Sequence, residues 1–69
     1  MAMAQAPTED EVVDAARSLE REEFTRDDVA EKLGVEISVL QPSWKAAKNA
    51  GRIQKSRNEG GTRYLRLAD

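Results

Sequence analysis

Residues 25–51 read TRDDVAEKLGVEISVLQPSWKAAKNAG, and this stretch holds two helical patterns that are separated by one glycine. Thr25 and Asp28 have the spacing of a capping box, in which side chain and backbone close the first turn of a helix with two hydrogen bonds. The apolar face that follows has three residues, Val29, Ala30 and Leu33. Gly34 suits the left-handed conformation that commonly ends a helix. The pattern predicts a helix over about 26–33.

A second helix is predicted over about 38–50, only a few residues after that glycine. Its buried face is expected to hold three residues that recur at helical spacing, Leu40, Trp44 and Ala47. Ser38 and Gln41 repeat the capping-box spacing, and Gly51 follows the last turn. Two helices joined by so short a turn form a helix-turn-helix.

Pro42 lies inside this second helical pattern, where proline removes one backbone hydrogen bond and crowds the preceding turn. With Ser38 as the cap, Pro42 is the fourth helical residue, and the lost bond is a terminal one. Proline also disfavours helical angles at the residue before it. The sequence therefore predicts a distorted or 3₁₀-like turn over 38–41 and regular helix from Pro42 onward.

A further helix is predicted upstream, over about 8–20. Thr8 and Glu11 form another capping box. The apolar residues that follow keep helical spacing: Val12, Val13, Ala15, Ala16 and Leu19. Residues 1–7 are interpreted as a disordered N-terminal tail, and residues 8–69 as a single domain.

The spacing of apolar residues changes after Gly51, from a helical repeat to the alternation that is typical of strands. Two short runs over about 52–57 and 62–67 contain β-branched and aromatic residues and flank the sequence NEGG. The glycine pair permits the positive φ angles of a tight hairpin turn. The residues expected to point inward are Ile53, Leu65 and Leu67. A two-stranded antiparallel ribbon is therefore predicted to complete an α+β fold.

The chain of 69 residues contains neither cysteine nor histidine. This composition excludes disulfides, thiolate zinc sites and the histidine-activated nucleophiles of many hydrolases. We expect no enzymatic activity, no metal and no cofactor. The opening MAMAQAP lacks the basic and long apolar segments of a secretory signal, and no apolar run is long enough to span a membrane. A cytoplasmic location is the expectation.

Charge is distributed unevenly along the chain. Residues 1–33 hold ten acidic and four basic side chains, whereas residues 34–69 hold seven basic and three acidic ones. The two halves therefore carry net charges of −6 and +4, although the whole chain carries −2. One basic face is typical of a protein that binds an anionic partner. Chance segregation of charge is the alternative.

The order of these elements resembles the winged helix-turn-helix domains of small bacterial and archaeal transcription regulators. The residues that carry the resemblance are VAEKLGVEISVL at 29–40, KNAGRI at 48–53 and RNEGGTRYLRL at 57–67. Pro42 departs from the pattern, because the third helix of that family usually runs unbroken through this position. The resemblance implies binding to double-stranded DNA, with the third helix in the major groove and the ribbon, or wing, on the backbone or in the minor groove.

The candidate DNA-contacting residues lie on the third helix, opposite its buried face, and on the wing. Helical geometry places six residues on or beside that face: Ser38, Gln41, Pro42, Lys45, Lys48 and Asn49. The second helix and the wing add four cations: Arg26, Lys55, Arg57 and Arg63. Cations can contact phosphates, amides can pair with adenine, and the proline ring can meet a thymine methyl. The plainer interpretation is a solvated helix face and a charged hairpin that protects a sheet edge.

Two further hypotheses concern the partners of the chain. A protein-interaction module is the competing function, with a basic protein partner attracted by carboxylates of the first two helical segments: Glu22, Glu23, Asp27 and Glu31. A homodimer formed through the first helix would also suit DNA binding, because paired domains read paired half-sites. Tyr64 is expected to pack on the third helix instead of touching DNA.

Overall fold

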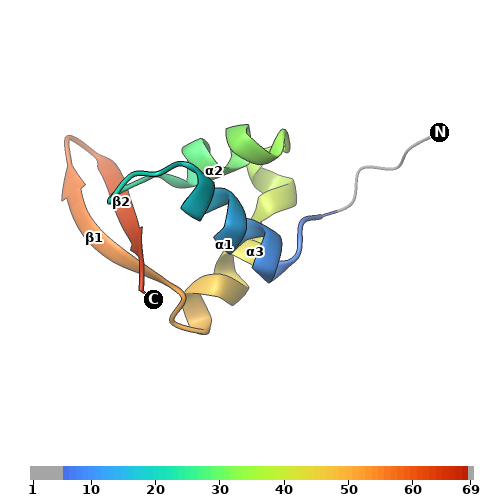
Figure 1. Ribbon diagram of the computed structural model, residues 1–69. Helices are drawn as coiled ribbons and strands as arrows, with labels where there is room; N and C mark the ends of the chain where they lie inside the picture. Colours follow the sequence, from blue (N-terminus) through green and yellow to red (C-terminus); the bar gives the residue numbers. More distant parts are fainter. Residues whose placement is uncertain (1–5, 69) are drawn as a thin grey trace.

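The computed structural model describes residues 6–68 and contains three helices followed by a two-stranded antiparallel sheet (Figure 1). The elements are α1 (Glu9–Ser18), α2 (Arg26–Leu33), α3 (Ile37–Asn49), β1 (Ile53–Glu59) and β2 (Thr62–Leu67). This α+β layout is consistent with a winged helix and confirms the predicted fold class. Within residues 6–68, no helix is both long and apolar enough to cross a membrane.

The starts of α1 and α2 are fixed by local side chains, as predicted. Thr8 accepts a hydrogen bond from the backbone amide of Glu11, and the Glu11 carboxylate accepts one from the amide of Thr8. Thr25 and Asp28 exchange the same pair of bonds at the start of α2. α2 ends at Gly34, whose φ of 70° is left-handed. Each signal lies within one turn of the helix boundary that it sets.

The start of α3 differs from the prediction. The helix begins at Ile37 with Glu36 as its N-cap, no side chain makes a capping bond, and the helix runs unbroken through Pro42. The predicted Ser38 cap and the predicted 3₁₀-like turn over 38–41 were wrong. The backbone amide of Leu40 donates to the carbonyl of Glu36 at 3.0 Å, which is the bond of a regular α-helix and lies before Pro42. Pro42 is therefore the sixth helical residue, not the fourth.

The core lies between the three helices and the base of the hairpin. It is made of Val12, Val13, Ala15, Ala16, Phe24, Val29, Ala30, Leu40, Trp44, Ala47, Ile53 and Leu65. Trp44 is 4% exposed and meets Phe24 edge to face, with ring centroids 6.3 Å apart. The predicted inward faces of all three helices are confirmed, and the face of α3 opposite Trp44 is left to solvent.

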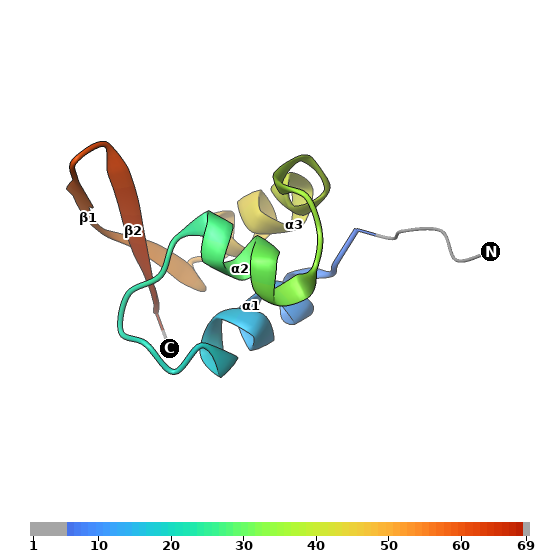
Figure 2. The same ribbon diagram turned by 90° about the horizontal axis from the view of Figure 1, so that it is seen from above.

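The hairpin extends from one side of the helical body (Figure 2). Glu59 pairs with Thr62 across a two-residue turn, in which Gly60 and Gly61 have φ angles of 56° and 82°. Positive φ at both positions is the requirement of a type I′ hairpin turn, so the role predicted for the glycine pair is confirmed. β1 continues two residues further toward the turn than predicted. Its register shifts at a bulge between Lys55 and Arg57.

The loop between α1 and α2 joins the sheet. Phe24 forms an isolated antiparallel bridge with Leu65: each backbone amide donates to the other residue's carbonyl, at 2.9 and 2.8 Å. β2 is therefore bonded on both edges, by β1 and by Phe24. The predicted tail over 1–7 falls mostly outside the described residues, but Pro7 is buried and its carbonyl accepts a hydrogen bond from the Ser43 hydroxyl on α3.

Candidate nucleic-acid interface

The exposed face of α3 holds the residues that helical spacing assigned to it. Four are exposed at intervals of three or four positions: Ser38, Pro42, Lys45 and Asn49. Gln41 and Lys48 are half-buried beside them. Because the helix is regular from Ile37, the face is continuous over more than three turns.

The wing has an inner face toward the helical body and an outer face, because side chains alternate between the two sides of a strand. Its inner face carries the buried residues Ile53 and Leu65. Lys55 pairs with Leu65, and Asn58 pairs with Arg63, which lies two residues before Leu65 on β2. Directly opposed residues of an antiparallel pair lie on the same face of the sheet. Lys55, Asn58 and Arg63 therefore belong to the inner face, toward the helical body.

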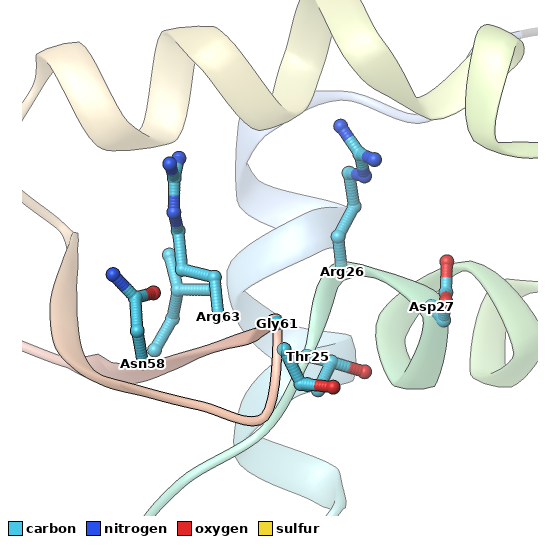
Figure 3. Close-up of a pocket in the computed structure, with 8 residues that line it drawn as sticks. Thr25, Arg26, Asp27, Asn58, Gly61 and Arg63 are labelled. Atoms are coloured by element: carbon cyan, nitrogen blue, oxygen red, sulfur yellow. The ribbon is translucent and has the colours of Figure 1, made fainter.

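A groove of about 640 Å³ separates the inner face of the wing from the start of α2. Arg26 and Asp27 line it from α2, and Asn58 and Arg63 line it from the wing. Figure 3 shows the side chains of Arg26 and Arg63 extending from opposite sides of this groove in the direction of α3. The start of α2 and the wing thus enclose one concave surface, which we call the wing groove, and the Arg26 and Arg63 side chains extend from it toward α3.

Arg26 also connects α2 to α3. Its Nη1 donates a hydrogen bond to Oε1 of Gln41 at 2.9 Å. Its Nε is buried and has no hydrogen-bond partner among the described residues. Burial of Nε removes part of the hydration of the Arg26 guanidinium. The hydrogen bond from Arg26 restricts rotation of the Gln41 carboxamide. Nothing in the sequence links Arg26 to Gln41, which lie 15 positions apart.

Arg57 lies apart from the other candidates, on the outer face of the wing. The bulge places it opposite Tyr64, and its guanidinium carbon lies 4.5 Å from the centre of that ring. Its Nε donates to Glu23 at 3.0 Å, and its Nη1 donates to Glu59. The expectation that Tyr64 packs on the third helix was wrong, because the residue alternates with the inward-pointing Leu65 and lies under Arg57.

The same outer-face network shifts the pKa values of its charged groups. Ser56 donates its hydroxyl hydrogen to Glu23. This bond, together with the bonds from Arg57, holds the pKa of the Glu23 carboxyl below its ordinary value. In return, the hydrogen bonds to Glu23 raise the pKa of Arg57. We call this set of contacts the outer brace; it ties β1 to the loop before α2.

Ion pairing divides nine of the eleven basic side chains into two groups, and the other two, Lys32 and Arg66, lie elsewhere without an ion pair to a described carboxylate. Within residues 6–68, five on or near the wing groove and the exposed face of α3 have no carboxylate partner: Arg26, Lys45, Lys48, Lys55 and Arg63. Four elsewhere are paired with carboxylates: Arg17, Arg21, Arg52 and Arg57. Lys32 lies near the negative end of the α2 dipole, and Arg66 lies near Glu23. Positive charge without a compensating carboxylate is thus concentrated on one side of the molecule.

Sequence reasoning missed Asn58 and Thr62 as residues of the groove. Both line it, next to Arg63 at the tip of the wing. The signal was available, because a two-residue glycine turn fixes which residues face each other across the hairpin. The bulge at Ser56 was not visible in the same way, since nothing in QKSRN marks it. That bulge is what places Arg57 opposite Tyr64, on the outer face.

No group of acidic side chains within residues 6–68 is arranged to hold a metal ion. No protein-family model, no curated protein and no solved structure matches the chain.

Proposed function

We propose that the chain is a DNA-binding domain of the winged helix-turn-helix class and acts as a small transcriptional regulator. In this proposal α3 enters the major groove and the inner face of the wing follows the backbone or the minor groove. The observation that carries the proposal is that five of the seven basic side chains without an ion pair within residues 6–68 lie on or near the wing groove and the exposed face of α3, while four basic side chains elsewhere pair with carboxylates. An anionic polymer is the partner that such a surface attracts.

The roles of individual residues follow from their positions. Lys45, Lys48 and Arg63 would contact phosphates, which fix the register of a protein on the duplex. Gln41 and Asn49 would meet base edges, because Asn49 lies on the exposed face of α3 and Gln41 lies beside it. Pro42 offers a rigid apolar ring on the same face.

The wing provides a matched pair of variants for testing the proposal. Arg63→Gln removes an unpaired charge from the inner face, and Arg57→Gln removes a paired charge from the outer face of the same hairpin. Affinity for a labelled mixed-sequence duplex, measured by fluorescence anisotropy at low and moderate salt, is expected to fall severalfold for Arg63→Gln and to change little for Arg57→Gln. Unfolding curves of both variants, measured at neutral pH, control for folding, because Arg57→Gln also removes a contact of the outer brace.

Two results would contradict the proposal. The first is the absence of binding by the unmodified protein at low salt, across duplexes of varied sequence. The second is an equal loss of affinity in the two arginine variants, which would indicate a general effect of positive charge.

A protein-interaction module is the second candidate function. It is favoured by the exposed carboxylates Glu22, Asp27 and Glu31, none of which forms an ion pair with another described residue. Glu23 is less accessible to a partner, because the outer brace engages it. Chemical-shift mapping separates the two functions: DNA would perturb residues 38–49 and the wing, whereas a basic protein would perturb α1 and α2.

A further inference from the structure

Only one orientation of the Gln41 carboxamide allows a hydrogen bond with Arg26. Arg26 donates from Nη1 to Oε1 of Gln41, and a guanidinium has hydrogen-bond donors only. The carboxamide oxygen must therefore face Arg26, because the amide nitrogen has no acceptor to meet there. The two hydrogens on Nε2 of Gln41 are left facing away from Arg26.

Arg26 is itself held in place. It is the first residue of α2, directly after a cap whose threonine and aspartate exchange two hydrogen bonds. Its side chain is half-buried, with Nε removed from water and unbonded within residues 6–68. The bond to Gln41 is the one hydrogen bond of this guanidinium to another described residue, so it compensates part of that lost hydration.

This orientation limits what Gln41 can read in the major groove. A glutamine pairs bidentately with adenine by accepting from N6 and donating to N7. A carboxamide oxygen can accept two hydrogen bonds, but the bond from Arg26 directs the oxygen of Gln41 toward α2, whereas both hydrogens of Nε2 have no acceptor within residues 6–68. Guanine presents two acceptors, N7 and O6, and suits a donor-only group. Adenine places its N6 donor beside N7, so one of the two hydrogens would face another donor.

We propose that Arg26 is a positioning residue that makes Gln41 a donor-only reader, so that Gln41 selects guanine over adenine at one base pair of the binding site. The proposal rests on the proposed function, in which α3 lies in the major groove. It replaces the adenine contact expected for Gln41 from its residue type alone, and it gives Arg26 a role other than phosphate binding.

Selection of bound duplexes from a random pool tests the proposal, because it reports base frequencies position by position. Gln41→Ala identifies the base pair that Gln41 reads, as the position whose preference is lost in that variant. The unmodified protein is expected to prefer guanine there. Arg26→Met has no donor and frees the carboxamide to turn, so the guanine-to-adenine ratio at that position should fall about tenfold, a typical value for one base contact. Arg26→Lys retains a donor-only group and should keep the guanine preference.

Several outcomes overturn the proposal. A preference for adenine at the Gln41 position overturns it while leaving DNA binding intact. So does an Arg26→Met variant that binds all sequences more weakly but keeps the same base preference, which is the behaviour of a phosphate contact. If no sequence is enriched and the unmodified protein does not bind at low salt, both this proposal and the proposed function are overturned. Should Arg26→Met fail to fold, the comparison of the unmodified protein with Gln41→Ala still decides between guanine and adenine.

Discussion

Pro42 is the residue at which the backbone bonding of α3 is incomplete. A residue at this position would normally donate its amide hydrogen to the carbonyl of Ser38, and proline has no such hydrogen. Ser38 and Pro42 are both exposed, so water can reach the unbonded carbonyl. The cost is therefore expected to be lower than the roughly 3 kcal/mol of a proline in a helix interior.

Replacing this proline is expected to stabilise the protein. Pro42→Ala restores the amide hydrogen and removes the crowding of the preceding turn, while the unfolded chain gains some flexibility. We expect the free energy of unfolding to rise by about 1–2 kcal/mol in urea titrations. Lys45→Ala, which alters the same exposed face without a backbone effect, should stay within about 0.5 kcal/mol of the unmodified protein. A stability that is unchanged or lower in Pro42→Ala would show that the ring makes compensating contacts.

Local sequence signals were sufficient to predict two of the three helix starts. The capping boxes at Thr8 and Thr25 were predictable because every atom involved lies within four residues. Ser38 has the same signal, but the helix starts before it. Ile37 is half-buried against the core, and this packing draws it into the helix ahead of the apparent cap. Tertiary packing outweighed a local preference that is worth about 1 kcal/mol.

At the scale of elements, the outer brace gives the wing a fixed attachment. The bond from Arg57 to Glu23 and the bond from Ser56 to the same carboxylate connect β1 to the loop before α2. The bridge between Phe24 and Leu65 connects β2 to the same loop. Because both strands are tied to one segment, the inner face of the wing keeps its orientation toward α3.

Acid should loosen the outer brace, and Glu23→Gln should reveal the effect. The pKa of Glu23 is lowered by folding, so its ionised form stabilises the folded state. This contribution is complete above the ordinary pKa of 4.5 and is lost as the pH falls through the lower folded-state pKa. The unmodified protein should therefore be more stable than Glu23→Gln at neutral pH, and the difference should shrink in acid.

Denaturant unfolding at a series of pH values, from neutral to about pH 3, measures this difference. Glu22→Gln is the matched control, because Glu22 is the adjacent exposed carboxylate and forms no ion pair with the described residues. The free energy of unfolding of Glu22→Gln should change with pH in the same way as that of the unmodified protein. Parallel curves for Glu23→Gln as well would mean that the brace contributes nothing through the charge of Glu23.

The strands were predictable as elements, but the faces of the wing were predictable only in part. The inward positions of Ile53 and Leu65 followed from alternation, and the register at the tip followed from the glycine pair. The bulge between Lys55 and Arg57 has no sequence signature, so the sequence could not separate Arg57 from Lys55 and Arg63, the other candidate DNA-contacting cations of the wing. The bridge at Phe24 was missed for a related reason, since a single bridging residue leaves no alternating pattern.

At the scale of the whole molecule, the charge asymmetry of the sequence becomes an asymmetry of surfaces. Basic side chains without an ion pair lie on or near the wing groove and the exposed face of α3, and exposed carboxylates remain on α2 and the loop before it. Asp27 lies at the border, because it lines the groove beside Arg26. The total charge of −2 conceals this division.

Under the proposed function, neutralising the acidic side should strengthen binding to DNA at low salt. The variant Glu22→Gln, Asp27→Asn, Glu31→Gln removes three negative charges that repel an approaching duplex. We expect a severalfold faster association by stopped-flow fluorescence at about 0.01 M salt and convergence with the unmodified protein at about 1 M, where charges are screened within about 3 Å. Asp27→Asn alone should account for most of the gain. Slower association of the triple variant at low salt would contradict this account.

The backbone bridge between Phe24 and Leu65 joins an early part of the chain to a late one. During synthesis the three helices leave the ribosome before the wing, and domains generally fold as their segments appear. The helices alone lack Ile53 and Leu65, two of the buried residues of the core. A nascent chain that has reached only α3 therefore exposes the side of Phe24 that the wing later covers. Folding can be completed only after residue 65 has left the ribosome, and until then the nascent helices lack the apolar contacts that Ile53 and Leu65 supply.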